Sequence, residues 1–274
     1  MVAPMGTDQN ILGIAGQKAL VVGGGFGMGR ESALLLARAG VAVAVADLDS
    51  ARADAVRDEV ARFAVAAHSL SADVTDRAQA ETLVRDAAAA LGGLDIVINI
   101  VGLATYASVF DIDDELWDRQ FSLNLRQHLY VSRETARVMM DAGKPGAIAL
   151  VASVSGIYGA PLHAAYGAAK AGLMGLVRTM SQEWGHYGIR VNAVAPDGIA
   201  TPRVAASFAA QGSTMQHLAD DTSLKRNGEA RDIAGALVYL VSDLAAFVTG
   251  QTIIVDGGVH AQMPHKMDAW ERKD

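Results

Sequence analysis

The chain has 274 residues, of which 51% are apolar, so it is long enough for one large domain or two small ones with a sizeable core. Its net charge of −7, without a block of like charges, argues against a nucleic-acid partner, because phosphate binding needs a basic surface. The absence of cysteine excludes disulfides and thiolate metal sites, and we find no membrane-spanning apolar run and no signal-peptide pattern in residues 1–13. We therefore expect a cytoplasmic protein without a membrane partner.

Short apolar runs rich in β-branched residues alternate with helical patterns along the chain. Strands are expected at 18–24, 40–47, 66–73, 93–102, 146–153, 189–196 and 251–258. Helices are expected at about 28–39, 50–63, 114–141, 162–184 and 229–242, with a further helix after Thr75, which can cap it. The stretch 197–228 and the polar tail after Val259 have no clear periodicity, so both are expected to be irregular.

This alternation predicts an α/β fold. Parallel strands joined by right-handed crossovers give a doubly wound, seven-stranded parallel sheet with helices on both faces. A closed eight-stranded α/β barrel is the alternative, but the number of units is one short, and a glycine-rich loop after the first strand favours the open sheet. The predicted organisation is an extension at 1–13, a single domain at 14–258 with a lid over the site at 202–225, and a tail at 259–274.

The stretch "VVGGGFGMGR" at residues 21–30 places glycines between the first strand and the first helix. The strict Gly-x-Gly-x-x-Gly pattern fails, because Met28 and Arg30 occupy the positions of its last glycine. A looser spacing of Gly23, Gly27 and Gly29 does fit, and it would allow a tight turn and a close approach of backbone N–H groups to a pyrophosphate. The glycines alone fit a tight turn without a nucleotide as well.

Asp47 ends the second strand, where a carboxylate can accept hydrogen bonds from an adenosine ribose. The same carboxylate would repel the extra phosphate of NADP, and the next residue, Leu48, offers that phosphate nothing. We therefore predict NAD(H) as the cofactor. The alternative is a capping or loop aspartate, although Asp49 and Ser50 are also available as caps.

Tyr166 and Lys170 stand four residues apart in "AAYGAAKAG", so they share one helix face. A nearby ammonium lowers the pKa of a tyrosine and favours proton exchange with a substrate oxygen. Ser153, at the end of the fifth strand, could hold the same oxygen. Taken alone, the pair fits a solvated helix face equally well, and Ser153 could be a cap. His163 is expected to be a surface residue at the helix start, with substrate contact as the alternative.

Taken in order, these elements resemble the short-chain dehydrogenase/reductase family over about 14–258. The resemblance rests on "VGGGFGMG" (22–29), "ADV" (72–74), "NIVG" (99–102), Asn124 in "FSLNL", the Ser153–Tyr166 spacing, Tyr-x-x-x-Lys, "APDGIAT" (195–201) and "TGQTIIVDGG" (249–258). Departures from the family pattern are Val22 for Thr, Ile100 and Val101 for Asn and Ala, and Asp197 for Gly. Asp197 would lie beside the nicotinamide or point to solvent.

The resemblance implies roles for these residues. Tyr166 would be the general acid and base, Lys170 would lower its pKa and bind the nicotinamide ribose, Ser153 would orient the carbonyl, and Asn124 would hold a water next to Lys170. With Tyr166 and Lys170, the expected cofactor contacts are Gly23, Gly25, Phe26, Gly27, Met28, Gly29, Asp47, Leu48, Asp73, Val74, Asn99, Val101, Gly102, Pro196, Asp197, Ile199 and Thr201. The expected substrate contacts are Ser153, Tyr158, Leu162, Tyr166, Val204 and Phe208.

The predicted function is the NAD(H)-dependent interconversion of a secondary alcohol and a ketone on a hydrophobic small molecule, without a metal. One alternative is a 3-oxoacyl-type reductase. Another is a non-catalytic nucleotide-binding scaffold, which would not need to keep all four of the residues assigned to catalysis. The resemblance also implies a homotetramer or a homodimer.

Overall fold

The computed structural model describes residues 10–210 and 214–262. Its strands form one parallel sheet in the order β3-β2-β1-β4-β5-β6-β7. The strands are β1 (Lys18–Val22), β2 (Ala42–Asp47), β3 (Ala67–Ser71), β4 (Ile96–Asn99), β5 (Gly146–Val151), β6 (Ile189–Pro196) and β7 (Thr252–Val255). All seven predicted strands are confirmed, with shorter ends in most cases.

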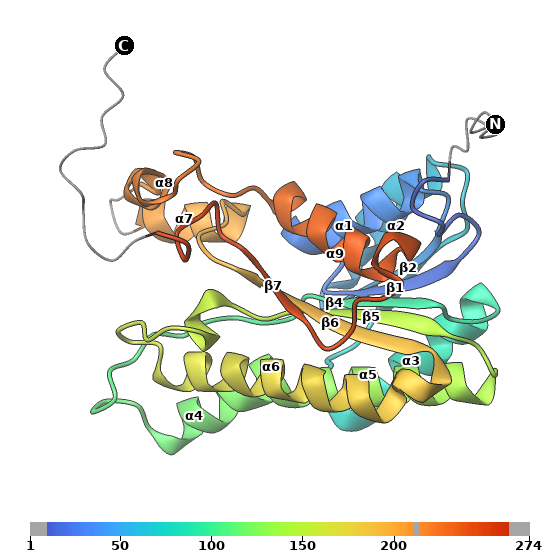
Figure 1. The fold of residues 1–274 in the computed structure, drawn as a ribbon, viewed down its shortest axis with the longest axis horizontal. Helices are drawn as coiled ribbons and strands as arrows, with labels where there is room; N and C mark the ends of the chain where they lie inside the picture. Colours follow the sequence, from blue (N-terminus) through green and yellow to red (C-terminus); the bar gives the residue numbers. More distant parts are fainter. Residues whose placement is uncertain (1–9, 211–213, 263–274) are drawn as a thin grey trace, which may run out of the picture.

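Helices cover both faces of this sheet (Figure 1). On one face lie α1 (Gly27–Arg38), α2 (Ser50–Ala61) and α9 (Ala230–Val241). On the other lie α3 (Arg77–Leu91), α4 (Asp114–Phe121), α5 (Gln127–Asp141) and α6 (Ala164–Trp184). Two short helices, α7 (Pro202–Ala210) and α8 (Gln216–Asp221), lie together at one end of the sheet. The doubly wound α/β fold is confirmed.

The central strands of the sheet are mostly apolar and are buried from both sides. In β2, Val43 and Val45 pack into the core beneath α1, α2 and α9, whereas Ala44 and Ala46 pack into the opposite core. Continuous apolar runs are what a parallel sheet with two covered faces requires, which is why these strands could be recognised from the sequence.

The strand order reverses direction between β1 and β4, the place where open α/β sheets form a ligand crevice beyond the carboxyl ends of their strands. The barrel alternative is wrong, because β3 and β7 are the two edges of an open sheet in the described part of the chain. The loops that follow β1, β2, β4, β5 and β6 therefore meet at this crevice.

Two expectations about helices are corrected by the structure. The helix expected at 114–141 is divided by a π-helical segment, Ser122–Arg126, between α4 and α5. The stretch 197–228 is not irregular throughout, since it contains α7 and α8. Asp76, rather than Thr75, caps α3, and Asp49 caps α2. Residues 211–213 of the expected lid lie outside the described residues. The same holds for residues 1–9 of the expected extension and residues 263–274 of the expected tail.

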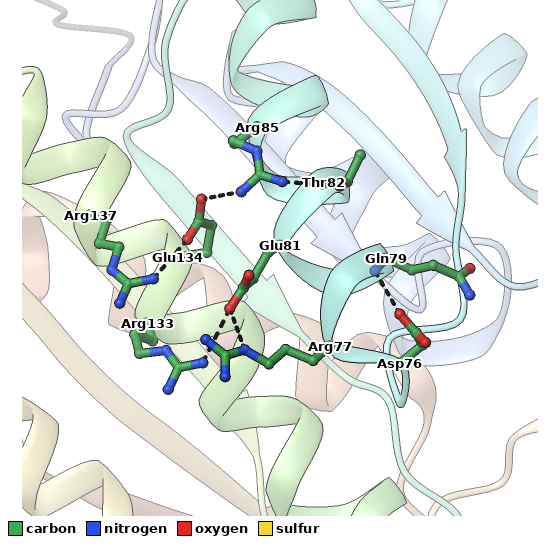
Figure 2. A network of polar contacts seen from close by, with 9 residues as sticks. All are labelled: Asp76, Arg77, Gln79, Glu81, Thr82, Arg85, Arg133, Glu134 and Arg137. Carbon is green, nitrogen blue, oxygen red and sulfur yellow. Dashed lines mark hydrogen bonds and ion pairs between the residues drawn. The ribbon is translucent and has the colours of Figure 1, made fainter.

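Ion pairs join α3 to α5 on the outer side of the molecule (Figure 2). The guanidinium of Arg85 on α3 lies 2.7 Å from the carboxylate of Glu134 on α5, which is only 6% exposed. In the reverse sense, Arg133 on α5 pairs with Glu81 on α3 at 3.2 Å. These contacts fix α5, and with it the π-helical segment that precedes α5, against the body of the domain.

Candidate active site

Ser153 and Tyr166 come together at the carboxyl end of β5. Ser153 is the second residue after β5, and its hydroxyl accepts a hydrogen bond from the backbone N–H of Ser155 at 3.2 Å. Tyr166 is in the first turn of α6, and its hydroxyl is hydrogen-bonded to that of Ser153. The cap interpretation of Ser153 and its place beside Tyr166 are therefore both seen in the structure.

The pKa of Tyr166 is raised above its ordinary value near 10, chiefly because the side chain is removed from water. The hydrogen bond from Ser153 lowers this pKa but does not compensate for burial. The sequence predicted a lowered pKa caused by Lys170. That expectation is not met in this structure, where the Nζ atom of Lys170 lies 5.8 Å from the centroid of the Tyr166 ring and burial dominates.

Lys170 is 2% exposed, so the pair does not form a solvated helix face. Its Nζ atom donates a hydrogen bond to the carbonyl oxygen of Val151 at 2.7 Å. Burial lowers the pKa of Lys170 from 10.5 to about 7, because the charged ammonium loses its hydration. A group with this pKa can take up and release a proton near neutral pH.

Asn124 lies in the π-helical segment and faces the loop after β4. Its Oδ1 atom accepts a hydrogen bond from the backbone N–H of Leu103, and its Nδ2 atom donates to Gln120 and to the carbonyl oxygen of Leu103. A Cβ atom placed on Gly102 would lie 2.9 Å from Asn124 Oδ1 and 3.0 Å from Lys170 Nζ. Asn124 and Lys170 thus flank the same glycine.

Asn99, at the end of β4, is held by a second amide side chain, that of Gln127, which no sequence motif indicates. The Nδ2 atom of Asn99 donates to Gln127 Oε1 at 2.9 Å, and its Oδ1 atom accepts from the backbone N–H of Val101 at 3.1 Å. Gln127 in turn donates to the carbonyl oxygen of Val101. Both amide side chains are fully buried, so the 99–101 segment is fixed in place.

The glycine loop meets the steric requirements of a close turn. A Cβ atom on Gly29 would lie 2.0 Å from the carbonyl oxygen of Gly23, and Gly23 itself has a φ of +78°. Neither position accepts a side chain. Helix α1 begins after Phe26 without a side-chain cap, so its first backbone N–H groups are available to an anion.

A cavity of about 80 Å³ lies where β1, β2, β3 and β4 end. Its lining includes Gly23, Asp47, Leu48, Ala72, Asp73, Val74 and Val101. The carboxylate of Asp47 accepts hydrogen bonds from the backbone N–H of Gly25 at 3.0 Å and of Asp49 at 3.1 Å, so it also shapes the loop. An uncapped helix start, a carboxylate and an apolar cavity in this order fit a dinucleotide.

Two further expected cofactor residues, Ile199 and Thr201, have structural partners of their own. Ile199 is 7% exposed and forms a β-bridge with Gly228. Thr201 caps α7 by accepting the backbone N–H of Val204, and its side chain lies 3.6 Å from where Gly27 would carry a Cβ. The segment after β6 therefore reaches the glycine loop across the crevice. Phe26 and Leu48 are exposed, Met28 is half-buried, and Pro196 ends β6.

The residues expected to contact substrate divide into two groups. Tyr158 and Leu162 lie in the loop between Ser153 and α6, and Leu162 has a φ of +66°. Val204 and Phe208 are on α7, and the contact seen for Phe208 is with His217 on α8, at 5.5 Å between ring centroids. The structure thus brings Tyr158 and Leu162 to the loop that carries Ser153, but it shows no contact of Val204 or Phe208 with Ser153 or Tyr166.

The surroundings of Tyr166 are more polar than the sequence suggested. The ring of His163 lies 5.9 Å from that of Tyr166 and 4.8 Å from that of Tyr106 in the loop after β4. Tyr158 donates a hydrogen bond to Asp197 at 3.0 Å. Asp197 is therefore not a solvent-pointing loop residue. The sequence predicted a hydrophobic substrate and hence a mostly apolar pocket, and these side chains correct that expectation.

A larger cavity, of about 240 Å³, lies on the outer side of the segment after β6. It is lined by Gly198, Ile199, Leu224, Arg226, Gly228, Asp232, Val255, Asp256 and Gly257. It contains neither Ser153 nor Tyr166, and its charged residues Arg226 and Asp232 pair with each other at 2.6 Å. We therefore place the chemistry at Ser153 and Tyr166 rather than in this cavity.

Comparison with known proteins identifies relatives over most of the chain. A family model described as enoyl-(acyl carrier protein) reductase matches residues 23–260. The 2-keto-3-deoxy-L-fuconate dehydrogenase of Xanthomonas campestris is 35% identical over 89% of this chain and 80% of its own length. In the described part of the chain, no helix is both long and apolar enough to cross a membrane.

Two solved structures are similar over nearly the whole chain. A 7α-hydroxysteroid dehydrogenase in complex with NADH and 7-oxo-glycochenodeoxycholic acid has a TM-score of 0.86 and 30% identity, and the match covers 92% of this chain and 97% of that one. A short-chain type dehydrogenase/reductase from Mycobacterium marinum has a TM-score of 0.86 and 29% identity, covering 93% of this chain and 99% of that one.

Proposed function

The chain belongs to the short-chain dehydrogenase/reductase family and is a Rossmann-fold oxidoreductase of alcohols and ketones, and from this premise we propose that it interconverts a secondary alcohol and a ketone with NAD(H), using Tyr166 as acid and base. The observation that carries the proposal is the hydrogen bond between Ser153 and Tyr166 at the crevice, with buried Lys170 on the same helix face. A non-catalytic scaffold would need neither this hydrogen bond nor a buried lysine beside it.

The bound nicotinamide would supply or accept the hydride. In the direction of reduction, the Tyr166 hydroxyl would give its proton to the substrate oxygen, and Ser153 would donate a hydrogen bond to the same oxygen as charge develops on it. In oxidation, Tyr166 would take the proton of the alcohol. Its raised pKa favours the protonated form, so the residue is ready as an acid before it is needed as a base.

Lys170 would then restore the proton of Tyr166. Its pKa of about 7 is close to the operating pH, where a group both accepts and releases protons efficiently. Its position next to Gly102 places it near a polar side chain, that of Asn124. The Oδ1 atom of Asn124 is fixed by the N–H of Leu103, so it can orient a donor in that space.

NAD(H) is proposed over the phosphorylated cofactor because Asp47 lines the cavity at the end of β2. The extra phosphate that NADP carries on its adenosine ribose would meet the like charge of the Asp47 carboxylate there. This repulsion would cost about 1 kcal/mol in water and more in a crevice. Arg30 cannot compensate, because its guanidinium is paired with Glu59 and Glu31. Arg52, which lies over the Phe26 ring and pairs with Asp49 at 3.2 Å, is a cation beside the glycine loop and would offset the repulsion only in part.

The test is a panel of secondary alcohols and ketones assayed for formation or consumption of NADH, with NADP(H) in parallel. The proposal predicts turnover of at least one class of alcohol, with a higher kcat/KM for NAD than for NADP. Cofactor binding without turnover of any alcohol or ketone would favour the scaffold alternative. Equal or better turnover with NADP would contradict the role given to Asp47.

We also propose that the protein is a homotetramer or a homodimer. β7 is an edge of the sheet, and the adjoining segment after α9 exposes two large apolar side chains, Leu244 and the fully exposed Phe247. An open edge with such side chains favours pairing with a second copy. Light scattering at micromolar concentration tests this, because a monomeric mass for the wild type would contradict it and Phe247→Asp should reduce the mass of the assembly.

A further inference from the structure

Tyr158 and Asp197 connect the loops that follow two neighbouring strands. Tyr158 lies in the loop after β5, which also carries Ser153, and Asp197 is the first residue after β6. The Tyr158 hydroxyl donates a hydrogen bond to Asp197 Oδ2 at 3.0 Å. Because β5 and β6 run parallel, this contact lies at the carboxyl ends of the strands, as the Ser153–Tyr166 pair does.

Asp197 is half-buried, and no lysine, arginine or histidine in the described part of the chain forms an ion pair with it. The hydrogen bond from Tyr158 is made to Oδ2, and Oδ1 has no hydrogen-bond partner among the described residues. A carboxylate that is removed from water in part and is not neutralised has a strong capacity to accept hydrogen bonds. A ligand with a donor group would supply what the protein does not.

The groups around this pair add acceptors rather than cations. Burial of the ring, followed by the carboxylates of Asp197 and Asp256, raises the pKa of Tyr158, so its hydroxyl stays protonated. The oxygens of Asp256 are already used by the backbone N–H groups of Gly258 and His260. The ring of His260 stacks on Tyr158 at 6.1 Å between centroids and closes its outer side. Asp197 is therefore the acceptor with free capacity.

Exposed apolar side chains lie on the loops that follow β4 and β5, and we take the space between these loops and Asp197 as the opening of the site. Tyr106 and Leu162 are more than half exposed, and Leu103 and Ile157 are exposed as well. The loops that carry them are joined by a hydrogen bond from the N–H of Ala107 to the carbonyl oxygen of Leu162 at 3.0 Å. A ligand at this opening would meet apolar surface and one acceptor, which is the pattern for a ring or chain with a hydroxyl.

We propose that Asp197, held by Tyr158, selects a substrate that carries a second hydroxyl besides the one that reacts: a diol, a hydroxyketone or a cyclic polyol. This inference rests on the proposed alcohol–ketone chemistry at Tyr166. A site built to accept a hydroxyl discriminates against the analogue that lacks it, because its acceptor is then left without a partner. For a charged acceptor, the expected preference is about 10- to 100-fold.

The test compares trans-1,2-cyclohexanediol with cyclohexanol, which differ by one hydroxyl. For the wild type we expect the ratio of kcat/KM, diol over mono-alcohol, to be at least about tenfold. Asp197→Asn should lower this ratio several-fold and Asp197→Ala should remove most of it. Asp220→Asn, which removes an exposed carboxylate from α8, is the matched control and should leave the ratio unchanged. Since the readout is a ratio, a general loss of activity does not affect it.

Binding is measured in parallel with the Tyr166→Phe protein, by ligand-observed NMR in the presence of cofactor, so that the result does not depend on turnover. The inference predicts that Tyr166→Phe binds the diol more tightly than cyclohexanol. The double variant that also carries Asp197→Asn should lose this preference. Equal binding of the two ligands, or an unchanged ratio in the Asp197 variants, would overturn it. Preference for 2-aminocyclohexanol over the diol would overturn the hydroxyl class. If the wild type turns over neither alcohol but the binding preference for the diol is preserved, the result would instead count against the proposed chemistry at Tyr166.

Discussion

Lys170 donates a hydrogen bond from Nζ to the carbonyl oxygen of Val151, the last residue of β5, at 2.7 Å. This contact joins the helix that carries Tyr166 to the strand that leads to Ser153. It also holds an amine in a place where water does not reach it, since Lys170 is 2% exposed. The site thus keeps Lys170 at a cost to stability, and the pH dependence of folding should show that cost.

The first prediction concerns this cost. The pKa of Lys170 is lowered from 10.5 to about 7, so between these values the unfolded chain binds a proton that the folded chain does not. The contribution of Lys170 to the free energy of unfolding should therefore rise with pH above 7, by up to about 1.4 kcal/mol per pH unit. Urea unfolding of the cofactor-free wild type and of Lys170→Met at pH 7, 8 and 9 measures this. Parallel pH dependences for the two proteins would contradict it.

Gly102 provides the second prediction. A Cβ atom there would lie 2.9 Å from Asn124 Oδ1 and 3.0 Å from Lys170 Nζ, so Gly102→Ala should displace one or both groups. We expect kcat to fall by about tenfold or more, since proton transfer by positioned groups contributes about 10²- to 10⁴-fold. Gly235→Ala on α9, where a Cβ meets no atom within 4 Å, is the control and should behave as wild type. Normal kcat in Gly102→Ala would remove Asn124 and Lys170 from the proposed relay.

The third prediction follows from the hydrogen bond between Ser153 and Tyr166. This bond lowers the pKa of Tyr166 against the effect of burial, so Ser153→Ala should raise that pKa further. Oxidation needs the deprotonated tyrosine, and its rate profile should therefore move to higher pH as well as to lower rates. Ser153→Thr, which keeps a hydroxyl, should restore part of the shift. The measurement is kcat for oxidation between pH 6 and 10, and a profile of unchanged position in Ser153→Ala would contradict it.

Cofactor choice gives the fourth prediction. In the wild type, kcat/KM should be higher with NAD than with NADP by about tens- to hundreds-fold, given the repulsion between a phosphate and Asp47. Asp47→Ala should weaken the binding of NAD and reduce the difference in kcat/KM between NAD and NADP. Arg52→Ala should widen it, because its guanidinium is a cation beside the glycine loop. Arg57→Ala, on the same helix but paired with Asp54 and Asp58, should have no effect. An Arg52 variant with unchanged preference would exclude that residue from the phosphate position.

The fold was predictable because its signals are local. The central strands are mostly apolar runs that are buried on both faces, and the turn at Gly23–Gly29 can only be made with glycine at its close approach. The spacing of Tyr166 and Lys170 on one helix is equally local. These features depend on residues within a few positions of one another, so the sequence carries them directly.

Other features depend on tertiary packing and could not be predicted. The π-helical segment at 122–126 changes the hydrogen-bond pattern by one residue without a change in composition, so the helix was expected to be continuous. The raised pKa of Tyr166 comes from burial by the assembled domain. Tyr158 and Asp197 are far apart in the sequence and meet only because β5 and β6 are neighbours.

The account depends most directly on Tyr166. In Tyr166→Phe only the hydroxyl is removed, so the protein should bind NAD with an affinity close to that of the wild type, measured by calorimetric titration. Its kcat for the best alcohol of the panel should fall by about 10²- to 10⁴-fold, the contribution of a positioned acid and base. Loss of turnover with retained binding is the result we predict. A variant that keeps more than about a tenth of the wild-type kcat would contradict the assignment of Tyr166 as the proton donor and acceptor.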